Sequence, residues 1–186
     1  MKFYRMYAKN ASENFVKPGA GLSHLIQGCM RSEFQYLDRL PVSVEIDKDG
    51  GLEFPDLIIH EDVIPLISER FRQILNRLDV DNLFCKPVTL TFALLGYSES
   101  YWLALPPRIR CLDMERCIIS QEQNEFLRTD ELIRKVEKIV IRPETVGNYK
   151  IFKLPAEYTN QDIIVTEEVK ETSETANLSN VYFSSL

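Results

Sequence analysis

The chain has 186 residues, of which 45% are apolar and 27% are charged, and this composition excludes an intrinsically disordered protein. Its length is typical of one domain, so we expect a single domain over residues 1–186. The 28 acidic residues outnumber the 22 basic ones and give a net charge of -6, which disfavours nucleic acid as a partner and favours a basic protein, although such a charge also serves solubility alone.

No segment has the features of an export signal or of a membrane helix. Residues 1–9 alternate apolar and charged side chains and lack the apolar core of a signal peptide. The longest apolar run, residues 88–95, is interrupted by threonines and is far shorter than the ~18 residues that a membrane helix needs. We therefore expect a soluble, cytoplasmic protein that does not interact with a membrane.

The first third of the chain predicts strands and turns. Alternating apolar residues predict one strand over residues 2–7 and a half-buried strand over residues 42–46. Residues 17–21 contain proline and glycines, but the lysine and hydroxyl that a phosphate-binding loop needs after its last glycine are missing, so these residues indicate a turn. A second turn at residues 47–51 allows residues 52–54 to return as a hairpin partner.

The most regular pattern of the chain is that of an amphipathic helix over residues 69–78. A short buried strand at residues 57–59 comes before it, and residues 65–68 lead into it. Ser68 is placed to cap the first turn, although a start at Asp62 is also compatible with the sequence. The apolar positions recur at spacings of three and four: Ile67, Phe71, Ile74, Leu75 and Leu78.

The middle of the chain predicts two central strands. Residues 88–95 and 100–105 are rich in β-branched and aromatic side chains and are separated by a turn at residues 96–99. Pro106 and the proline after it end the second strand, because proline has no amide hydrogen to donate. Residues 109–112 resume extended structure.

The last third predicts a hairpin and a second strand followed by a helix. After a polar segment at residues 120–130, a strand over 136–141 and another over 149–154 form a hairpin that turns at Gly147. Residues 163–170 have the same order as residues 66–72: apolar residues, then a hydroxyl cap, here Thr166, then acidic residues in the first turn of a helix. A closing strand over 180–183 completes an α+β fold, a mostly antiparallel sheet with one or two packed amphipathic helices.

Neither metal binding nor nucleophilic catalysis is indicated. The four cysteines lack the close pairs of a zinc site, and with only two histidines a four-ligand set would have to be assembled from distant segments: Cys29, Cys85, Cys111, Cys117, His24 and His60. His24 and Cys29 form the sharpest candidate pair for a nucleophile and base, but such residues in an apolar stretch are usually packing residues. We expect no catalytic, cofactor-binding or metal-binding residues.

Five residues are candidates for contact with a partner protein: Tyr97, Tyr101, Asp113, Glu115 and Tyr158. Tyrosines near loop ends bury ring area while the hydroxyl stays in water, which suits an interface. The two acidic residues also fit acid and base catalysis, but such a pair is expected by chance among 28 acids, and Asp113 also suits a turn.

The pattern from residue 55 onward resembles that of an immunity-protein family of bacterial polymorphic toxin systems, first catalogued as a domain of unknown function. The similarity rests on seven segments: Pro55-Asp56 and residues 66–71, 101–103, 111–115, 151–154, 163–169 and 178–183. It implies a cytoplasmic protein that binds and occludes a cognate toxin, and it carries over no catalytic residue. Residues 1–54 show no such similarity and form the N-terminal portion beside an immunity-protein-like portion, residues 55–186.

The chain departs from this pattern at one position, where a glycine is expected before the closing strand and Ser179-Asn180 stands instead. Asparagine tolerates a left-handed backbone, so the departure is mild. Two other functions compete with the inhibitor: a self-assembling scaffold subunit, which light scattering would detect, and a hydrolase that uses Cys29 or an acidic pair.

Overall fold

The computed structural model describes residues 1–9, 14–19, 25, 28–29, 43–47, 50–61, 63–92, 96–123, 132–158 and 160–186, and all structural statements below concern these residues. Several predicted features lie outside the described residues: the loop residues 20–21, His24, Val42, the turn residues 48–49, the helix start at Asp62, the strand residues 93–95 and residues 124–130 of the polar segment.

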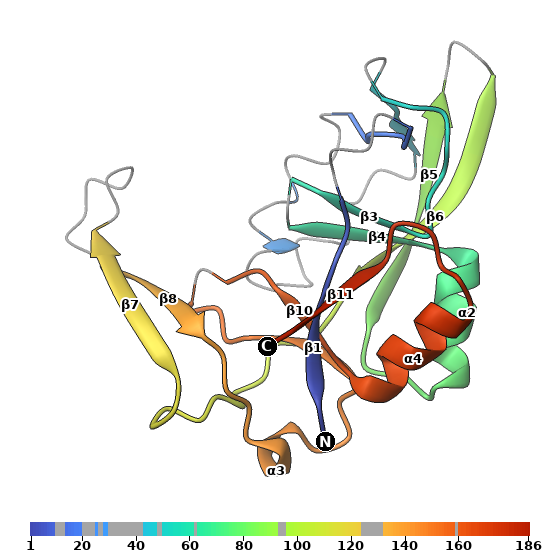
Figure 1. The fold of residues 1–186 in the computed structure, drawn as a ribbon. Helices are drawn as coiled ribbons and strands as arrows, with labels where there is room; N and C mark the ends of the chain where they lie inside the picture. Colours follow the sequence, from blue (N-terminus) through green and yellow to red (C-terminus); the bar gives the residue numbers. More distant parts are fainter. Residues whose placement is uncertain are drawn as a thin grey trace.

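Strands dominate the described part of the chain and short helices follow two of them, so the α+β class is confirmed (Figure 1). The elements in chain order are β1 (Phe3–Tyr7), β2 (Ser43–Glu45), β3 (Leu57–His60), β4 (Ile64–Ser68), α2 (Glu69–Arg77), β5 (Phe84–Phe92), β6 (Tyr97–Leu105), β7 (Ile118–Gln123), β8 (Leu132–Lys138), α3 (Pro143–Val146), β9 (Ile151–Lys153), β10 (Ile163–Thr166), α4 (Glu167–Thr175) and β11 (Tyr182–Ser185).

The strands form two main sheets and a separate hairpin (Figure 1). The four-stranded sheet has the order β11-β1-β10-β9 and is antiparallel throughout. The five-stranded sheet has the order β2-β5-β6-β4-β3, and only the pairing of β2 with β5 is parallel. The hairpin of β7 and β8 extends to one side of the body.

Three apolar clusters hold these layers together, because several strands bury both faces. The central cluster contains residues of both main sheets and of the two longer helices, such as Met6, Ile67, Phe71, Val165 and Val169. A second cluster covers the other face of the five-stranded sheet, and a third lies between the four-stranded sheet and the β7–β8 hairpin. Consecutive residues of one strand therefore reach different clusters.

The predicted strand-to-helix unit occurs twice, and the two copies share their geometry. In both, a short buried strand passes directly into a nine-residue helix: β4 into α2 and β10 into α4. Ser68 caps α2 as predicted, because its Oγ accepts the Phe71 amide at 3.1 Å. The cap predicted at Thr166 is wrong: its side chain makes no capping bond, and its buried Oγ1 has no partner among the described residues.

Both helices also end in the same way. Asp79 after α2 and Asn177 after α4 have positive φ angles of 52° and 50°. The next residue then donates its amide back over the last turn, from Val80 to the Leu75 carbonyl at 3.0 Å and from Leu178 to the Ser173 carbonyl at 3.3 Å. This is the Schellman arrangement, in which the residue that follows the left-handed one is apolar and packs on the helix.

The left-handed backbone expected near the closing strand is confirmed at Asn180, which has a φ of 58°. Its side chain adds two contacts, accepting the Lys9 amide at 3.0 Å and donating to the Leu57 carbonyl at 2.9 Å. Asparagine thus adopts the backbone of a glycine there and also ties β3 to the segment after β1.

Several predicted pairings are wrong. Residues 52–54 are not the hairpin partner of β2, because Ser43–Glu45 pairs with Thr89–Thr91 in parallel and Glu53 forms a bridge with Phe15. Residues 65–68 do not merely lead into the helix but belong to β4, which pairs with β3.

The hairpin predicted for residues 136–154 is also wrong. Residues 120–123, predicted as part of a polar segment, belong to strand β7, which takes β8 as its partner, whereas β9 pairs with β10. The short helix α3 intervenes, and Gly147, with a φ of 61°, ends this helix instead of turning a hairpin. The predicted strands at residues 2–7, 57–59, 88–92, 100–105 and 163–166 are confirmed in position.

Candidate functional site

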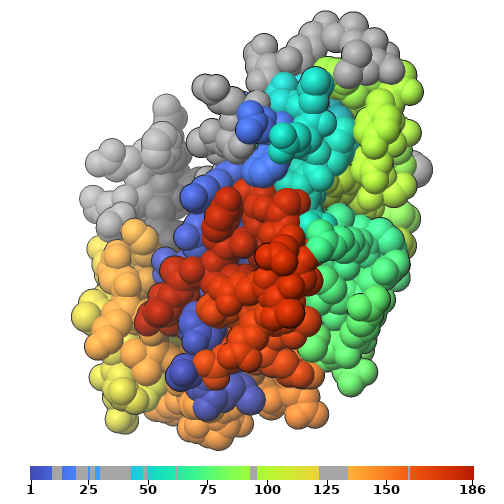
Figure 2. All heavy atoms as spheres, turned by 45° about the vertical axis from the view of Figure 1, so that its right-hand side comes forward, coloured from blue at the N-terminus to red at the C-terminus, as the bar shows by residue number. Residues whose placement is uncertain are grey.

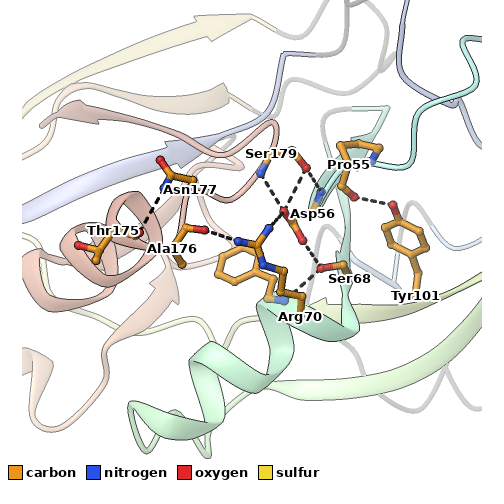
Figure 3. A network of polar contacts seen from close by, with 10 residues as sticks. Pro55, Asp56, Ser68, Arg70, Tyr101, Thr175, Ala176, Asn177 and Ser179 are labelled. Atoms are coloured by element: carbon orange, nitrogen blue, oxygen red, sulfur yellow. Dashed lines mark hydrogen bonds and ion pairs between the residues drawn. The ribbon is translucent and has the colours of Figure 1, made fainter.

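A network of polar contacts joins the two strand-to-helix units at Asp56 (Figure 3). The Asp56 carboxylate is 6% exposed and accepts from the Ser68 hydroxyl at 2.6 Å, the Ser179 amide at 2.8 Å and the Ser179 hydroxyl at 3.0 Å. Arg70 donates to the same carboxylate at 3.3 Å and also to the carbonyl of Ala176 at the end of α4. Each carboxylate oxygen therefore has a donor, and the charge is paired.

This network contains residues that carry the family resemblance. Pro55-Asp56 precedes β3, Ser68 and Arg70 lie at the start of α2, and Tyr101 of β6 donates to the Pro55 carbonyl at 2.5 Å (Figure 3). Three segments that are distant in sequence thus meet at one point. Their contacts are internal, so the network fixes the junction between the units, and we assign it a structural role.

Next to this junction the single tryptophan is held by two side chains of α2. The Trp102 indole donates to Glu69 at 2.6 Å, and the Arg72 guanidinium lies 3.6 Å from the centre of the ring. The bond from Trp102 is the main reason why the pKa of Glu69 lies below its usual range. These contacts attach the exposed side of α2 to β6.

An open acidic hollow of about 750 Å³ lies at the other end of the two helices. Four segments form its wall: the N-terminus, the turn after α2, residues 147–150 and the first half of α4. Its charged residues comprise five acids and two lysines: Asp79, Asp81, Glu167, Glu168, Glu171, Lys2 and Lys150. Figure 2 shows the N-terminal strand in blue beside α4 in orange-red. Tyr149 and Met1 add exposed apolar area.

Two of the acids are paired with the lysines. Lys2 lies 3.0 Å from Glu167, and this contact raises the pKa of Lys2 and lowers that of Glu167. Lys150 lies 3.0 Å from Glu168 and also donates to the Leu78 carbonyl at the end of α2 at 2.7 Å.

The remaining acids of the hollow are not compensated. Asp79, Asp81 and Glu171 are exposed and have no ion pair among the described residues. The hollow therefore combines uncompensated negative charge with an exposed tyrosine, a combination that suits a basic protein partner.

The structure does not bring the five predicted contact residues together. Tyr97 is half exposed and contacts Phe54 near the turn that joins β5 and β6. Asp113 and Glu115 lie on the loop before β7, where the Asp113 carboxylate accepts the Glu115 amide at 3.3 Å. The turn role predicted for Asp113 agrees with this bond.

Tyr101 and Tyr158 are core residues and not surface anchors. Tyr101 is 1% exposed and its hydroxyl is used within the chain, while Tyr158 is 5% exposed and contacts Met114. The prediction expected the hydroxyl groups of these tyrosines to stay in water, but both rings fill apolar clusters.

The residues of the hollow were not predicted from the sequence. One signal was present, because Glu167, Glu168 and Glu171 fall within five residues of a single helix. The second group, Asp79 and Asp81, follows a different helix, and its proximity to the first depends on the tertiary fold.

The buried thiol of Cys29 does not have the features of a nucleophile. Burial raises its pKa to about 11, so the unreactive thiol form is favoured. Among the described residues no group of three or more histidine, cysteine or acidic side chains is arranged to hold a metal ion.

Residues 5–186 match a family of immunity proteins, and the chain belongs to this family. It is the Immunity protein family (Imm11), and the match includes nearly all of the N-terminal portion as well as residues 55–186. No curated protein matches the chain. In the described part of the chain, no helix is both long and apolar enough to cross a membrane.

Proposed function

We propose that this protein binds a cognate toxin of a bacterial polymorphic toxin system in the cytoplasm and neutralises it by covering its surface, without catalysis. The observation that carries the proposal is membership of the Imm11 family over residues 5–186. The net charge of -6 supports a basic partner, because opposite charges speed the encounter of two proteins. We also treat residues 1–186 as one domain, since β1 lies inside the sheet that β9, β10 and β11 complete.

The acidic hollow is the part of the surface that fits such a toxin best. Its unpaired carboxylates attract basic side chains, and Tyr149 offers ring area that a partner can cover. Tyr97, Asp113 and Glu115 stay candidates for contact at separate places on the surface.

The function is tested by producing the protein together with the toxin encoded beside it. We expect protection of the cells and a stable complex of the purified pair. If cells die as readily as without the protein, and the pair migrates separately in gel filtration, the proposed function is wrong.

The hollow is tested by removing two of its charges with little change in shape. Asp79→Asn with Asp81→Asn keeps a residue that tolerates the left-handed backbone at position 79. We expect the association rate with the toxin to fall about tenfold at low salt and the difference to shrink at high salt, because long-range attraction is screened. Stopped-flow fluorescence measures this rate.

The matched control removes two exposed acids elsewhere, Glu45→Gln with Glu53→Gln, and leaves the same net charge. An equal loss in both variants would show that the hollow has no special role. A third variant, Asp113→Asn with Glu115→Gln, tests the predicted acidic pair in the same assay; unchanged binding removes this pair from the interface.

A further inference from the structure

Helices α2 and α4 lie side by side on one face of the molecule and carry opposite charge (Figure 2). Over Glu69–Arg77, three arginines and one glutamate give α2 a charge of +2. Over Glu167–Thr175, four glutamates and one lysine give α4 a charge of -3. A basic stripe thus borders an acidic stripe on one surface, which we call the two-helix face.

The two helices run antiparallel. Arg70 at the start of α2 reaches the Ala176 carbonyl at the end of α4. At the opposite end, Lys150 joins the Leu78 carbonyl after α2 to Glu168 in the first turn of α4. These contacts fix which residues of α2 and α4 lie at the same position along the common direction of the two helices, which we call their height.

Between the helices is an open groove of about 430 Å³ that is lined by one charged residue of each helix. Arg77 and Glu171 both line it, together with the apolar atoms of Ile74 and Ala176. Neither Arg77 nor Glu171 has a hydrogen bond or ion pair among the described residues. Opposite charges thus stand at similar height on neighbouring helices, neither of them in an ion pair, although Lys2 and Lys170 are near enough to attract Glu171.

We propose that the two-helix face binds a second copy of this chain in a symmetric dimer. We place the two-fold axis in the interface, parallel to the helices. Rotation about this axis does not change the position of a residue along the helix direction, and it places α2 of one copy against α4 of the other. Arg77 then meets Glu171 of the second copy, and the reverse contact forms as well. An axis across the helices would instead place α2 against α2 and α4 against α4, which like charges disfavour.

The interface of the proposed dimer is polar. The exposed residues of the face are mainly charged side chains, and most of the apolar residues of both helices face the central cluster. Its association therefore depends on salt, unlike that of an obligate dimer with an apolar interface. The dimer does not depend on toxin binding, although Glu171 also lines the acidic hollow. The variants at Asp79 and Asp81 that test the hollow leave Arg77 and Glu171 unchanged.

The test exchanges the two charges. Arg77→Glu places two acids at each symmetric contact, and Glu171→Arg places two arginines there, so each variant alone becomes a monomer. A mixture of the two variants has an arginine opposite a glutamate at both contacts. We expect the mixture to dimerise as a heterodimer with an affinity close to that of the wild type, and each single variant to bind itself at least about tenfold more weakly.

Light scattering after gel filtration at low ionic strength measures the mass, and native mass spectrometry of one isotope-labelled variant identifies the heterodimer. In about 1 M salt, where the Debye length falls to about 3 Å, the wild-type dimer should dissociate. Circular dichroism checks that both variants fold. A wild-type chain that stays monomeric at every concentration, or single variants that dimerise as well as the mixture, would overturn the proposal.

Discussion

Replacing Asp56 by alanine should lower the free energy of unfolding by roughly 3–5 kcal/mol, the largest effect expected of any polar substitution in this chain. The carboxylate accepts four hydrogen bonds from Ser68, Arg70 and Ser179 and is nearly inaccessible to water. Its removal leaves buried donors without an acceptor and Arg70 without its ion pair. In a chain of this size the loss corresponds to a fall in melting temperature of roughly 10 °C.

Two further variants make this experiment specific. Asp56→Asn keeps the shape but places an amide NH₂ among donors, so it should also destabilise the protein strongly. Asp113→Ala removes a carboxylate with longer contacts, 3.3 Å to the Glu115 amide and 3.5 Å to Arg142, and should cost only about 1 kcal/mol. Equal losses for Asp56→Ala and Asp113→Ala in urea denaturation would contradict the role of the network.

Replacing Lys153 by methionine should stabilise the protein at neutral pH by roughly 3 kcal/mol. Lys153 is 1% exposed, and its ammonium group donates to the Val63 carbonyl at the long distance of 3.4 Å. Burial, together with the positive charge of Arg108, lowers the pKa of Lys153 from its ordinary value of 10.5 to about 8, although Cys29 and Asp162 oppose this. Below pH 8 the folded chain thus holds a buried charge that the unfolded chain exposes to water.

The direction of the pH dependence follows from these two values. Between pH 8 and 10.5 the unfolded chain keeps the proton that the folded chain releases, so this group makes the wild type more stable as the pH rises. The advantage of Lys153→Met should therefore be full below about pH 8 and disappear by about pH 10.5. Lys138→Met, on the exposed side of β8, is the control and should show no such change. A Lys153→Met advantage that is constant over this range would show that burial does not shift this lysine.

The sequence predicted those elements that depend on local chemistry. Ser68 as a cap, the apolar period of α2 and the left-handed backbone at Asn180 all follow from a few neighbouring residues, and all are confirmed. The two strand-to-helix units were predicted for the same reason, because each is continuous in the chain.

Pairing between distant segments could not be predicted in the same way. No strand was predicted for β7, because most of its residues belong to a polar segment, and its strand character depends on β8 as a partner. The strand β9 took β10 instead of its predicted neighbour, since its alternating pattern fits any partner with an apolar face. The acidic hollow brings together four separate segments of the chain, so its residues share no local pattern.

The position of β1 within its sheet delays the completion of that sheet during protein synthesis. Phe3–Tyr7 lies between β10 and β11, so both of its neighbours are synthesised long after it. A nascent chain on the ribosome cannot complete the four-stranded sheet until β11 has emerged, and the closure of this long loop slows folding. Chains released early by a premature stop would leave β1 as an unpaired apolar segment, available to chaperones and proteases.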